Sequence, residues 1–422
     1  MPTLPAAVRA SSNTVRDVTG AAPPLRVAIF TESYLPYLSG VTVSTEALAR
    51  GLGAAGHQVL LVAPRPAGVD LGSAGAAGPE PAYAWLPSYQ APPPAPAGYR
   101  MPIPVPSGAL RAAREFAPDV AHAQSPFVSG LMARRVAQHT RAPLVFTHHT
   151  RFADYGHYLG PLARPAASAA AAYLRDFWGG CAAVVAPGTE LAGDIRDRLG
   201  PRPQPVVRII PTGVDVAAIR SLPPVDLRER FGWPADTVVA VTLGRLAVEK
   251  SIALLLEAFA LAAASDERLR LLVVGGGPAE AALRERVAAP DLAGRAALTG
   301  RLPRMAALSL AKGGDLFVFA SRTETQGLVL AEALTAGLPI VALAGPGVED
   351  SVRDGVDGLV IHGAGDGELG SGLAQAIVSL AGDGARRRRM AAAAAQDASR
   401  FDVTTRVGEV VRLYNELLIG RA

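Results

Sequence analysis

RVAIFTESYLPYLSGVTVSTEALARGLGAAGHQVLLVA (26–63) is the stretch that decides the fold. Its first five residues are an apolar run typical of a buried parallel strand, and a turn-rich loop leads from them to Ser39-Gly40. Apolar residues at helical spacing follow over 41–55, and the apolar run 58–63 predicts a second strand. Strand, loop, helix and strand make one βαβ unit, so the stretch predicts a parallel sheet.

The same alternation continues to residue 210. Further strands are expected over 119–123, 144–149, 182–187 and 206–210, and helices over 107–116, 128–139, 163–179 and 189–199. The Pro- and Ala-rich segment 64–106 interrupts this pattern, and little regular structure is expected there.

The apolar run VVAVTLG (238–244) predicts a strand that opens the second half of the chain, and the alternation of strands and helices is repeated from there. The expected strands are 269–275, 296–300, 315–321 and 339–344, and the expected helices are 251–264, 279–288, 304–312, 327–336, 370–381 and 403–418. The predicted fold class is therefore α/β, with two doubly wound Rossmann-like domains facing each other across a cleft.

Five parts are expected along the chain. They are a disordered leader (1–24), an N-terminal Rossmann-like domain (25–210), a Pro-containing linker (211–234), a C-terminal Rossmann-like domain (235–400) and a C-terminal helix (401–422). The last helix has apolar residues along one side, so it is expected to pack back towards the N-terminal domain.

The bulk composition is that of an ordinary globular protein. Half of the 422 residues are apolar and 18% are charged. No uninterrupted apolar stretch has the length of a membrane-spanning helix, and the first 24 residues lack the apolar middle of a signal peptide. The single cysteine, Cys181, excludes an internal disulfide. A cytoplasmic location is expected.

One group of charged residues follows the strand that opens the second half. Of the 41 basic residues, only Lys250 and Lys312 are lysine. Arg245 and Lys250 can converge on one diphosphate from a strand-to-helix loop, because arginine grips two oxygens and lysine supplies a point charge. The spacing equally fits two solvated surface cations.

A second group runs from Glu324 to Glu332, after the strand expected over 315–321. Gly327 permits close backbone approach, and the helix start beside it offers free N–H groups to a phosphate. The two carboxylates would accept hydrogen bonds from hydroxyls at opposite ends of an elongated sugar nucleotide. In the alternative interpretation Glu324 is a charge favoured by the helix dipole and Glu332 faces solvent.

Taken together, these residues resemble the donor site of retaining GT-B glycosyltransferases of family 4 (group 1). The resemblance joins the E-x7-E pattern of Glu324 and Glu332 to Arg245 and Lys250, and it runs from about Arg26 to the C-terminus. It implies that the N-terminal domain is the acceptor side and that the C-terminal domain binds the nucleotide sugar.

The resemblance also implies a role for each residue. Arg245 and Lys250 would hold the diphosphate, and the backbone of Gly327-Leu328 would contact its β-phosphate. Glu324 would hold hydroxyls of the transferred sugar and assist catalysis, by positioning and charge stabilisation rather than as a nucleophile. Glu332 would hold the ribose hydroxyls.

In the N-terminal half, Ser39-Gly40-Val41 looks like the family's Gly loop, where the helix start approaches the donor phosphates. His149, in FTHHT (146–150), matches the family's catalytic histidine. No metal or other cofactor is expected, because Arg245 and Lys250 could supply the positive charge and the chain has no Asp-x-Asp triplet.

Several motifs resemble bacterial enzymes that glucosylate diacylglycerol, namely TESYLP (31–36), HAQSPF (122–127), HTRFADY (149–155), PTGVD (211–215) and Gln326. They imply a hexosyltransferase that moves glucose from UDP-glucose to a membrane lipid. Transfer to a soluble acceptor (a secondary metabolite or an intracellular sugar), mannosyl transfer from GDP-mannose, a GT-B epimerase and a sugar-nucleotide-binding protein without transfer activity are the alternatives. No nucleic-acid partner is expected.

Two segments bear on peripheral contact with the cytoplasmic face of a membrane. Arg386–Arg389 is either a basic patch for lipid headgroups or an exposed helix face. Residues 161–180, with Arg164, Arg175, Phe177 and Trp178, could lie on a bilayer, or their Ala-rich face could belong to the core.

Overall fold

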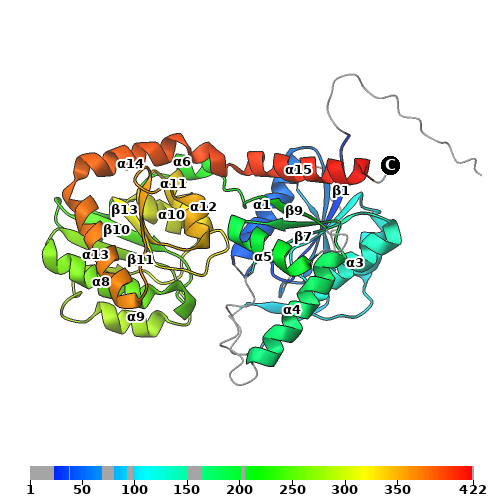
Figure 1. Cartoon of the computed structure of the whole chain (residues 1–422), viewed down its shortest axis with the longest axis horizontal. Helices are drawn as coiled ribbons and strands as arrows, with labels where there is room; N and C mark the ends of the chain where they lie inside the picture. Colours follow the sequence, from blue (N-terminus) through cyan, green and yellow to red (C-terminus); the bar gives the residue numbers. More distant parts are fainter. Residues whose placement is uncertain are drawn as a thin grey trace, which may run out of the picture.

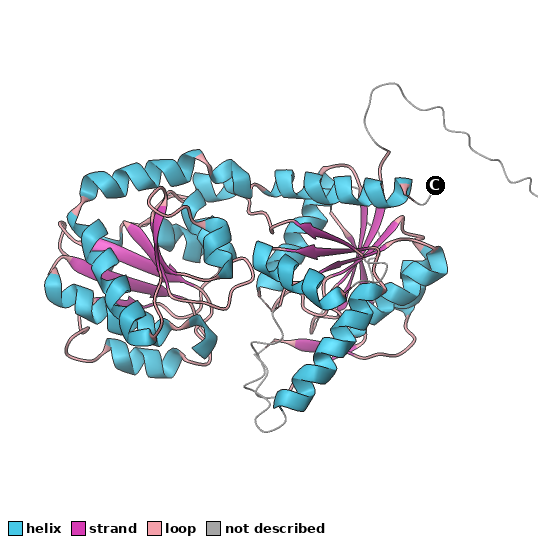
Figure 2. Cartoon of the chain, viewed as in Figure 1, coloured by secondary structure: helices cyan, strands magenta, loops and turns pink. Residues whose placement is uncertain are grey.

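The computed structural model describes residues 23–37, 39–68, 80–92, 98–150, 163–200 and 205–420, with the backbone alone for 163–167. Its strands gather in two groups, each covered by helices on both faces (Figure 2). The predicted pair of doubly wound α/β domains is therefore confirmed.

The first sheet is parallel throughout, in the order β3-β2-β1-β6-β7-β8-β9. Its strands are β1 (Arg26–Phe30), β2 (Gln58–Pro64), β3 (Ala82–Leu86), β6 (Val120–Ala123), β7 (Leu144–Thr147), β8 (Ala183–Ala186) and β9 (Val206–Ile209). Val27 pairs with Val59 on one side and with Val120 on the other. The chain therefore reverses its direction of sheet growth at β1, and the crevice outside the ends of β1 and β6 is the switch point where ligands of such sheets bind.

Helices from both ends of the chain cover this sheet. One face packs against α2 (Gly108–Glu115), α3 (Val128–Thr140), α4 (Ala163–Gly179) and α5 (Thr189–Leu199). The other face packs against α1 (Gly40–Ala54) and α15 (Val403–Ile419). In Figure 1 the red α15 extends from the C-terminal domain and lies along the N-terminal one. Tyr414 of this helix is fully buried and packs into the hydrophobic core of the first domain.

The second sheet is also parallel, in the order β12-β11-β10-β13-β14-β15. Its strands are β10 (Val238–Leu243), β11 (Leu269–Val274), β12 (Ala296–Leu298), β13 (Leu316–Phe319), β14 (Ile340–Leu343) and β15 (Gly358–Ile361). Its switch point lies between β10 and β13.

The helices of the second domain also form two layers. One layer is α8 (Ile252–Ser265), α9 (Glu280–Val287) and α13 (Asp366–Gly382). The other is α6 (Val216–Ser221), α7 (Leu227–Phe231), α10 (Arg304–Lys312), α11 (Leu328–Thr335), α12 (Pro346–Ser351) and α14 (Gly384–Gln396). Two 3-10 turns, η2 (Val248–Lys250) and η3 (Ala398–Phe401), adjoin these layers.

Three expectations about local structure need correction. Segment 64–106 was expected to lack regular structure, yet it contains β3, β4 (Ser88–Gln90) and β5 (Arg100–Pro102). Strand β3 forms because Leu86 is buried against the sheet while the rings of Tyr83 and Trp85 stack. The expected linker contains α6 and α7, and the sequence analysis did not anticipate α12, β15 or α14.

The segment 161–180 agrees with neither earlier interpretation. Phe177 and Trp178 are buried in the first core, so these two aromatic residues are not available to a bilayer. The Ala-rich face is the exposed one at 168–170, which is the reverse of the core interpretation. Residues 161–162 and the side chain of Arg164 lie outside the described part.

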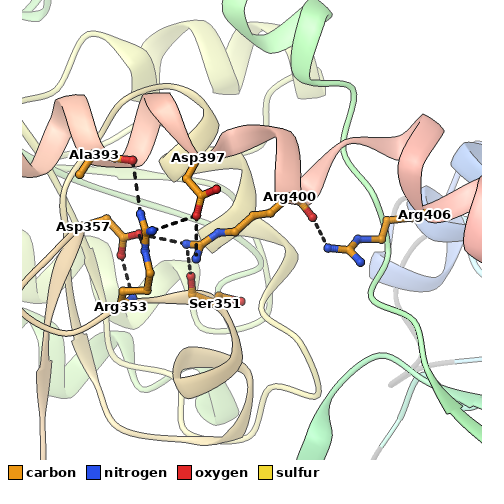
Figure 3. A network of polar contacts seen from close by, with 7 residues as sticks. All are labelled: Ser351, Arg353, Asp357, Ala393, Asp397, Arg400 and Arg406. Carbon is orange, nitrogen blue, oxygen red and sulfur yellow. Dashed lines mark hydrogen bonds and ion pairs between the residues drawn. The ribbon is translucent and has the colours of Figure 1, made fainter.

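A charged cluster, here named the Asp357 clamp, joins α14 and η3 to the second sheet. It consists of Arg353, Asp357, Asp397 and Arg400. Figure 3 shows both arginines converging on the carboxylate of Asp357, which is fully buried and lies 2.7 Å from Arg353 Nε and 3.0 Å from Arg400 Nη2. Arg406, on α15, donates to the carbonyl of Arg400. The clamp thus anchors the point where the chain leaves the second domain.

Substituting Asp357→Asn should lower the free energy of unfolding by about 2 kcal/mol, because two guanidinium groups lose a buried charged acceptor. Asp397→Asn is the matched control. Asp397 contacts the same two arginines with its side chain 42% exposed, so its loss should cost less than about 1 kcal/mol. Denaturant unfolding measures both variants, and equal losses would contradict the assignment of Asp357 as the anchor.

Candidate active site

The structure brings Lys250 and Glu324 into direct contact. Lys250 ends η2, just beyond β10, and Glu324 lies on the loop after β13. Because β10 and β13 are neighbours, the loops that follow them meet at the switch point. The ammonium and the carboxylate form an ion pair, with a quarter of the lysine side chain exposed. A cation and a carboxylate from two different loops therefore lie side by side at the switch point.

Arg245 is held by a carboxylate that the sequence analysis did not single out. Its guanidinium pairs with Glu249, four residues further along the chain, and the Glu249 side chain is only 7% exposed. The backbone carbonyl of Glu249 accepts bonds from Ser321 and Thr323, both at 3.3 Å. The loop after β10 is thereby tied to the loop after β13.

Glu332 is buried inside α11. Its carboxylate accepts hydrogen bonds from Arg304, with Nε at 3.1 Å. Burial raises the pKa of Glu332, and the neighbouring guanidinium of Arg304 opposes that rise. The interpretation that Glu332 faces solvent is therefore wrong. Arg304 begins α10, some 28 residues away in sequence, and no local pattern marks it as a partner.

Gly327 caps the N-terminus of α11. Its φ is +70°, and a Cβ there would lie 2.8 Å from Leu330 Cδ1, so the position favours glycine. Leu328 is the first helical residue, and its N–H belongs to the first turn, which lacks intrahelical acceptors. Gln326 donates to and accepts from the backbone of Thr212, at 2.8 and 2.7 Å. This contact holds the loop against the segment that joins the two sheets.

Gly40 is the first residue of α1. Ser39 caps this helix by accepting from the backbone N–H of Thr42 at 3.2 Å. Gly40 is exposed, and no atom of the described chain lies within 4 Å of a Cβ built there. The start of α1 therefore offers an open helix N-terminus, a site type suited to anions.

His149 follows β7 and lies against the second domain. Its Nε2 is 2.7 Å from Gln124 Oε1, and its backbone carbonyl accepts a bond of 2.9 Å from the hydroxyl of Thr325. Burial lowers the pKa of His149 to about 3, with His148 contributing, so the ring is neutral at physiological pH. His148 points the other way, where its Nδ1 accepts from Trp178 at 3.2 Å. Of the two adjacent histidines, His149 is the one hydrogen-bonded to the other half of the site.

A further contact joins the two domains beside this site. The carboxylate of Asp350 accepts hydrogen bonds from the N–H and the hydroxyl of Thr189, at 2.8 and 2.6 Å. Thr189 begins α5 in the first domain, and Asp350 lies in α12 in the second. The strand-end loops of the two sheets therefore touch at two places, Thr189–Asp350 and His149–Thr325.

Comparison with known proteins identifies the family. The model "Glycosyltransferase Family 4" matches residues 38–218, and "Glycosyl transferases group 1" matches residues 226–397. The alpha-monoglucosyldiacylglycerol synthase of Acholeplasma laidlawii is 30% identical over 348 residues, covering 80% of this chain and 85% of that protein. The chain is a group 1 GT-B glycosyltransferase.

Two further matches describe the range of this family. A GDP-mannose-dependent alpha-mannosyltransferase of Corynebacterium glutamicum is 29% identical and covers 80% of this chain and 77% of its own. The crystal structure of Anabaena HepE in complex with UDP-glucose has a TM-score of 0.70 at 18% identity, covering 93% of this chain and all of that one. The fold of this glycosyltransferase is thus the GT-B fold, and its activity is that of a hexosyltransferase.

Neither a membrane-spanning helix nor a cluster of metal-binding side chains occurs among the described residues. None of their helices is both long and apolar enough to cross a membrane. In that same part of the glycosyltransferase, no group of three or more His, Cys, Asp or Glu side chains is placed to hold a metal ion.

Substituting Gly40→Val should lower the transfer rate about 100-fold, because two methyl groups would occupy the space in front of the helix start and displace a bound donor. The melting temperature should change little, since a Cβ at this position has no described protein atom within 4 Å. Gly193→Val, a substitution at an equally open glycine on α5, is the control and should keep full activity. Wild-type rates for Gly40→Val would remove this helix start from the donor site.

Proposed function

We propose that this glycosyltransferase moves a hexosyl group, with retention of configuration, from a nucleotide diphosphate sugar to a hydroxyl group. The observation that carries this proposal is the ion pair between Lys250 and Glu324 at the switch point of the second sheet. The residue after Glu324 is Thr325, whose hydroxyl donates a hydrogen bond to the backbone carbonyl of His149 on the first domain. Groups suited to a diphosphate, to sugar hydroxyls and to the reacting centre thus follow one another along one surface.

The proposed mechanism is largely electrostatic. Arg245, Lys250 and the N–H groups at Gly327-Leu328 would stabilise the diphosphate as it leaves, a contribution that preorganised charges make well. Glu324 would hold the sugar hydroxyls and offset the positive charge that develops on the sugar. The acceptor hydroxyl would attack from the face that the diphosphate leaves, and the departing phosphate would take its proton.

We propose UDP-glucose as the donor and a membrane lipid such as diacylglycerol as the acceptor. The similarity to the alpha-monoglucosyldiacylglycerol synthase of Acholeplasma laidlawii supports glucose as the sugar and diacylglycerol as the acceptor. The complex of the GT-B protein HepE with UDP-glucose supports the choice of nucleotide. The enzyme would then work in the cytoplasm, in peripheral contact with the inner face of the membrane.

The similarity to the Corynebacterium glutamicum enzyme favours a second candidate, mannosyl transfer from GDP-mannose. Thermal-shift measurements with UDP-glucose and GDP-mannose would separate the two donors, because a bound donor raises apparent stability.

Anomer analysis of the product by NMR would test retention. Transfer to diacylglycerol in anionic vesicles, compared with transfer to soluble sugars, would test the acceptor. Transfer to soluble sugars without vesicle binding would overturn the lipid proposal.

The two lysines make a matched pair for testing the diphosphate site. Lys250→Ala should lower kcat about 100-fold with the fold intact, because it removes a cation from the leaving group. Lys312 instead donates to the carbonyls of Arg220 and Leu222, at 2.6 and 2.8 Å. Lys312→Ala should therefore lower stability by about 1 kcal/mol and leave kcat unchanged. Full activity in Lys250→Ala would remove the diphosphate assignment.

Metal removal gives a separate prediction. Arg245 and Lys250 would supply the charge that a divalent cation supplies in other transferases, so activity should be the same with and without EDTA. Loss of activity in EDTA, with recovery on adding Mg²⁺ or Mn²⁺, would contradict this arrangement.

A further inference from the structure

Gln124 is a buried amide at the switch point of the first sheet. It follows directly on β6, and its backbone N–H donates to the carbonyl of Phe30, at the end of β1, at 2.8 Å. Its side chain is enclosed, since the residue is 3% exposed. The amide therefore lies between the two strand ends where doubly wound sheets bind ligands.

The neighbouring polar residue on the same side of β6 is fully paired. His122 lies two residues before Gln124, so both side chains point to the face that α1 and α15 cover. The ring of His122 lies between Tyr414 Oη, at 2.6 Å from Nδ1, and Thr147 Oγ1, at 2.7 Å from Nε2. Both ring nitrogens of the buried His122 therefore have a hydrogen-bond partner within the protein.

One end of the Gln124 amide determines the protonation of His149. The carbonyl oxygen Oε1 only accepts, so His149 Nε2, 2.7 Å away, carries the proton and donates it. A neutral imidazole has a single N–H, and burial keeps this ring neutral by lowering its pKa to about 3. The other nitrogen, Nδ1, is therefore an acceptor.

The other end of the amide has no protein acceptor. Gln124 Nε2 is buried and makes no hydrogen bond to any residue that the structure describes. A buried donor without a partner costs free energy, and native proteins rarely retain one without a reason. Gln124 Nε2–H is therefore a buried donor that can bind a ligand oxygen, and His149 Nδ1 is a separate acceptor at the opposite edge of the ring.

We propose that Gln124 is a further substrate-binding residue that holds His149 in its Nε2-protonated form and donates its own Nε2–H to a substrate hydroxyl. The inference rests on the proposed function, since it takes the ligand to be a sugar or its acceptor. The hydroxyl belongs either to the transferred hexose or to the acceptor, and the experiment below distinguishes these sources.

The first measurement needs no turnover. Imidazole ¹⁵N shifts of the full-length chain should show His149 protonated at Nε2. Gln124→Met should give a mixture of tautomers, whereas Gln124→Glu, which keeps an acceptor oxygen, should keep Nε2 protonated. An Nδ1-protonated His149 in the wild type, or unchanged shifts in Gln124→Met, would overturn the positioning role.

The second measurement uses UDP-glucose, with and without diacylglycerol. Gln124→Met should lower kcat/KM for transfer about tenfold, with the Kd for UDP unchanged, because the cations proposed to hold the diphosphate, Arg245 and Lys250, lie on the other domain. Hydrolysis of UDP-glucose falling together with transfer assigns the hydroxyl to the hexose. Unchanged hydrolysis with a raised KM for the lipid assigns it to the acceptor. If neither rate changes, Gln124 does not bind substrate.

Tyr414→Phe is the structural control, because it removes the fully paired bond to His122 on the same sheet face. It should lower the melting temperature and leave both the His149 tautomer and the ratio of hydrolysis to transfer at wild-type values. A wild-type chain that neither hydrolyses nor transfers UDP-glucose would count against the proposed donor, while the ¹⁵N measurement would still decide the role of Gln124 towards His149.

Discussion

Pairing of the backbone in two parallel sheets is the constraint on which the rest of this structure depends. Buried strands use their N–H and C=O groups in the sheet ladder, so groups for chemistry must come from the loops at strand ends. Lys250, Glu324, Gln124 and His149 all lie at or just beyond the carboxyl ends of strands that border or adjoin a switch point. Contacts across the two domains then bring these loops onto one surface.

Opposite charges hold the charged residues of the candidate site in place. Arg245 pairs with Glu249, Lys250 with Glu324, and Arg304 with Glu332. Partly buried cations and carboxylates are costly when unpaired, so each partner fixes the other in a defined position. Fixed charges of this kind stabilise a developing anion without having to reorganise during the reaction.

Two chain segments that cross between the domains run side by side. Val214 and Asp402 form a parallel bridge, in which the N–H of Val214 donates to Phe401 and the N–H of Val403 donates to Val214. Beyond this point α15 completes the first core, and before it the Asp357 clamp fixes η3 to the second domain. Arg400 also donates to the carbonyl of Ser351, whose hydroxyl bonds to Gln326, next to Gly327. The crossing is thus connected by hydrogen bonds to the loop between β13 and α11.

The sequence by itself determined the α/β class, the two-domain plan and most strands and helices, because apolar periodicity reports local burial directly. It also indicated Arg245, Lys250, Glu324 and Gly327, since these stand at strand ends or at a helix start. Only the tertiary structure decided that Glu332 is buried against Arg304, that Glu249 holds Arg245, and that Gln124 meets His149. Each of these contacts depends on where an element packs, and sequence spacing carries no information about such distances. The short strand β3 was missed for the same reason. Its pairing with β2 stabilises it more than the intrinsic strand propensity of its five residues does.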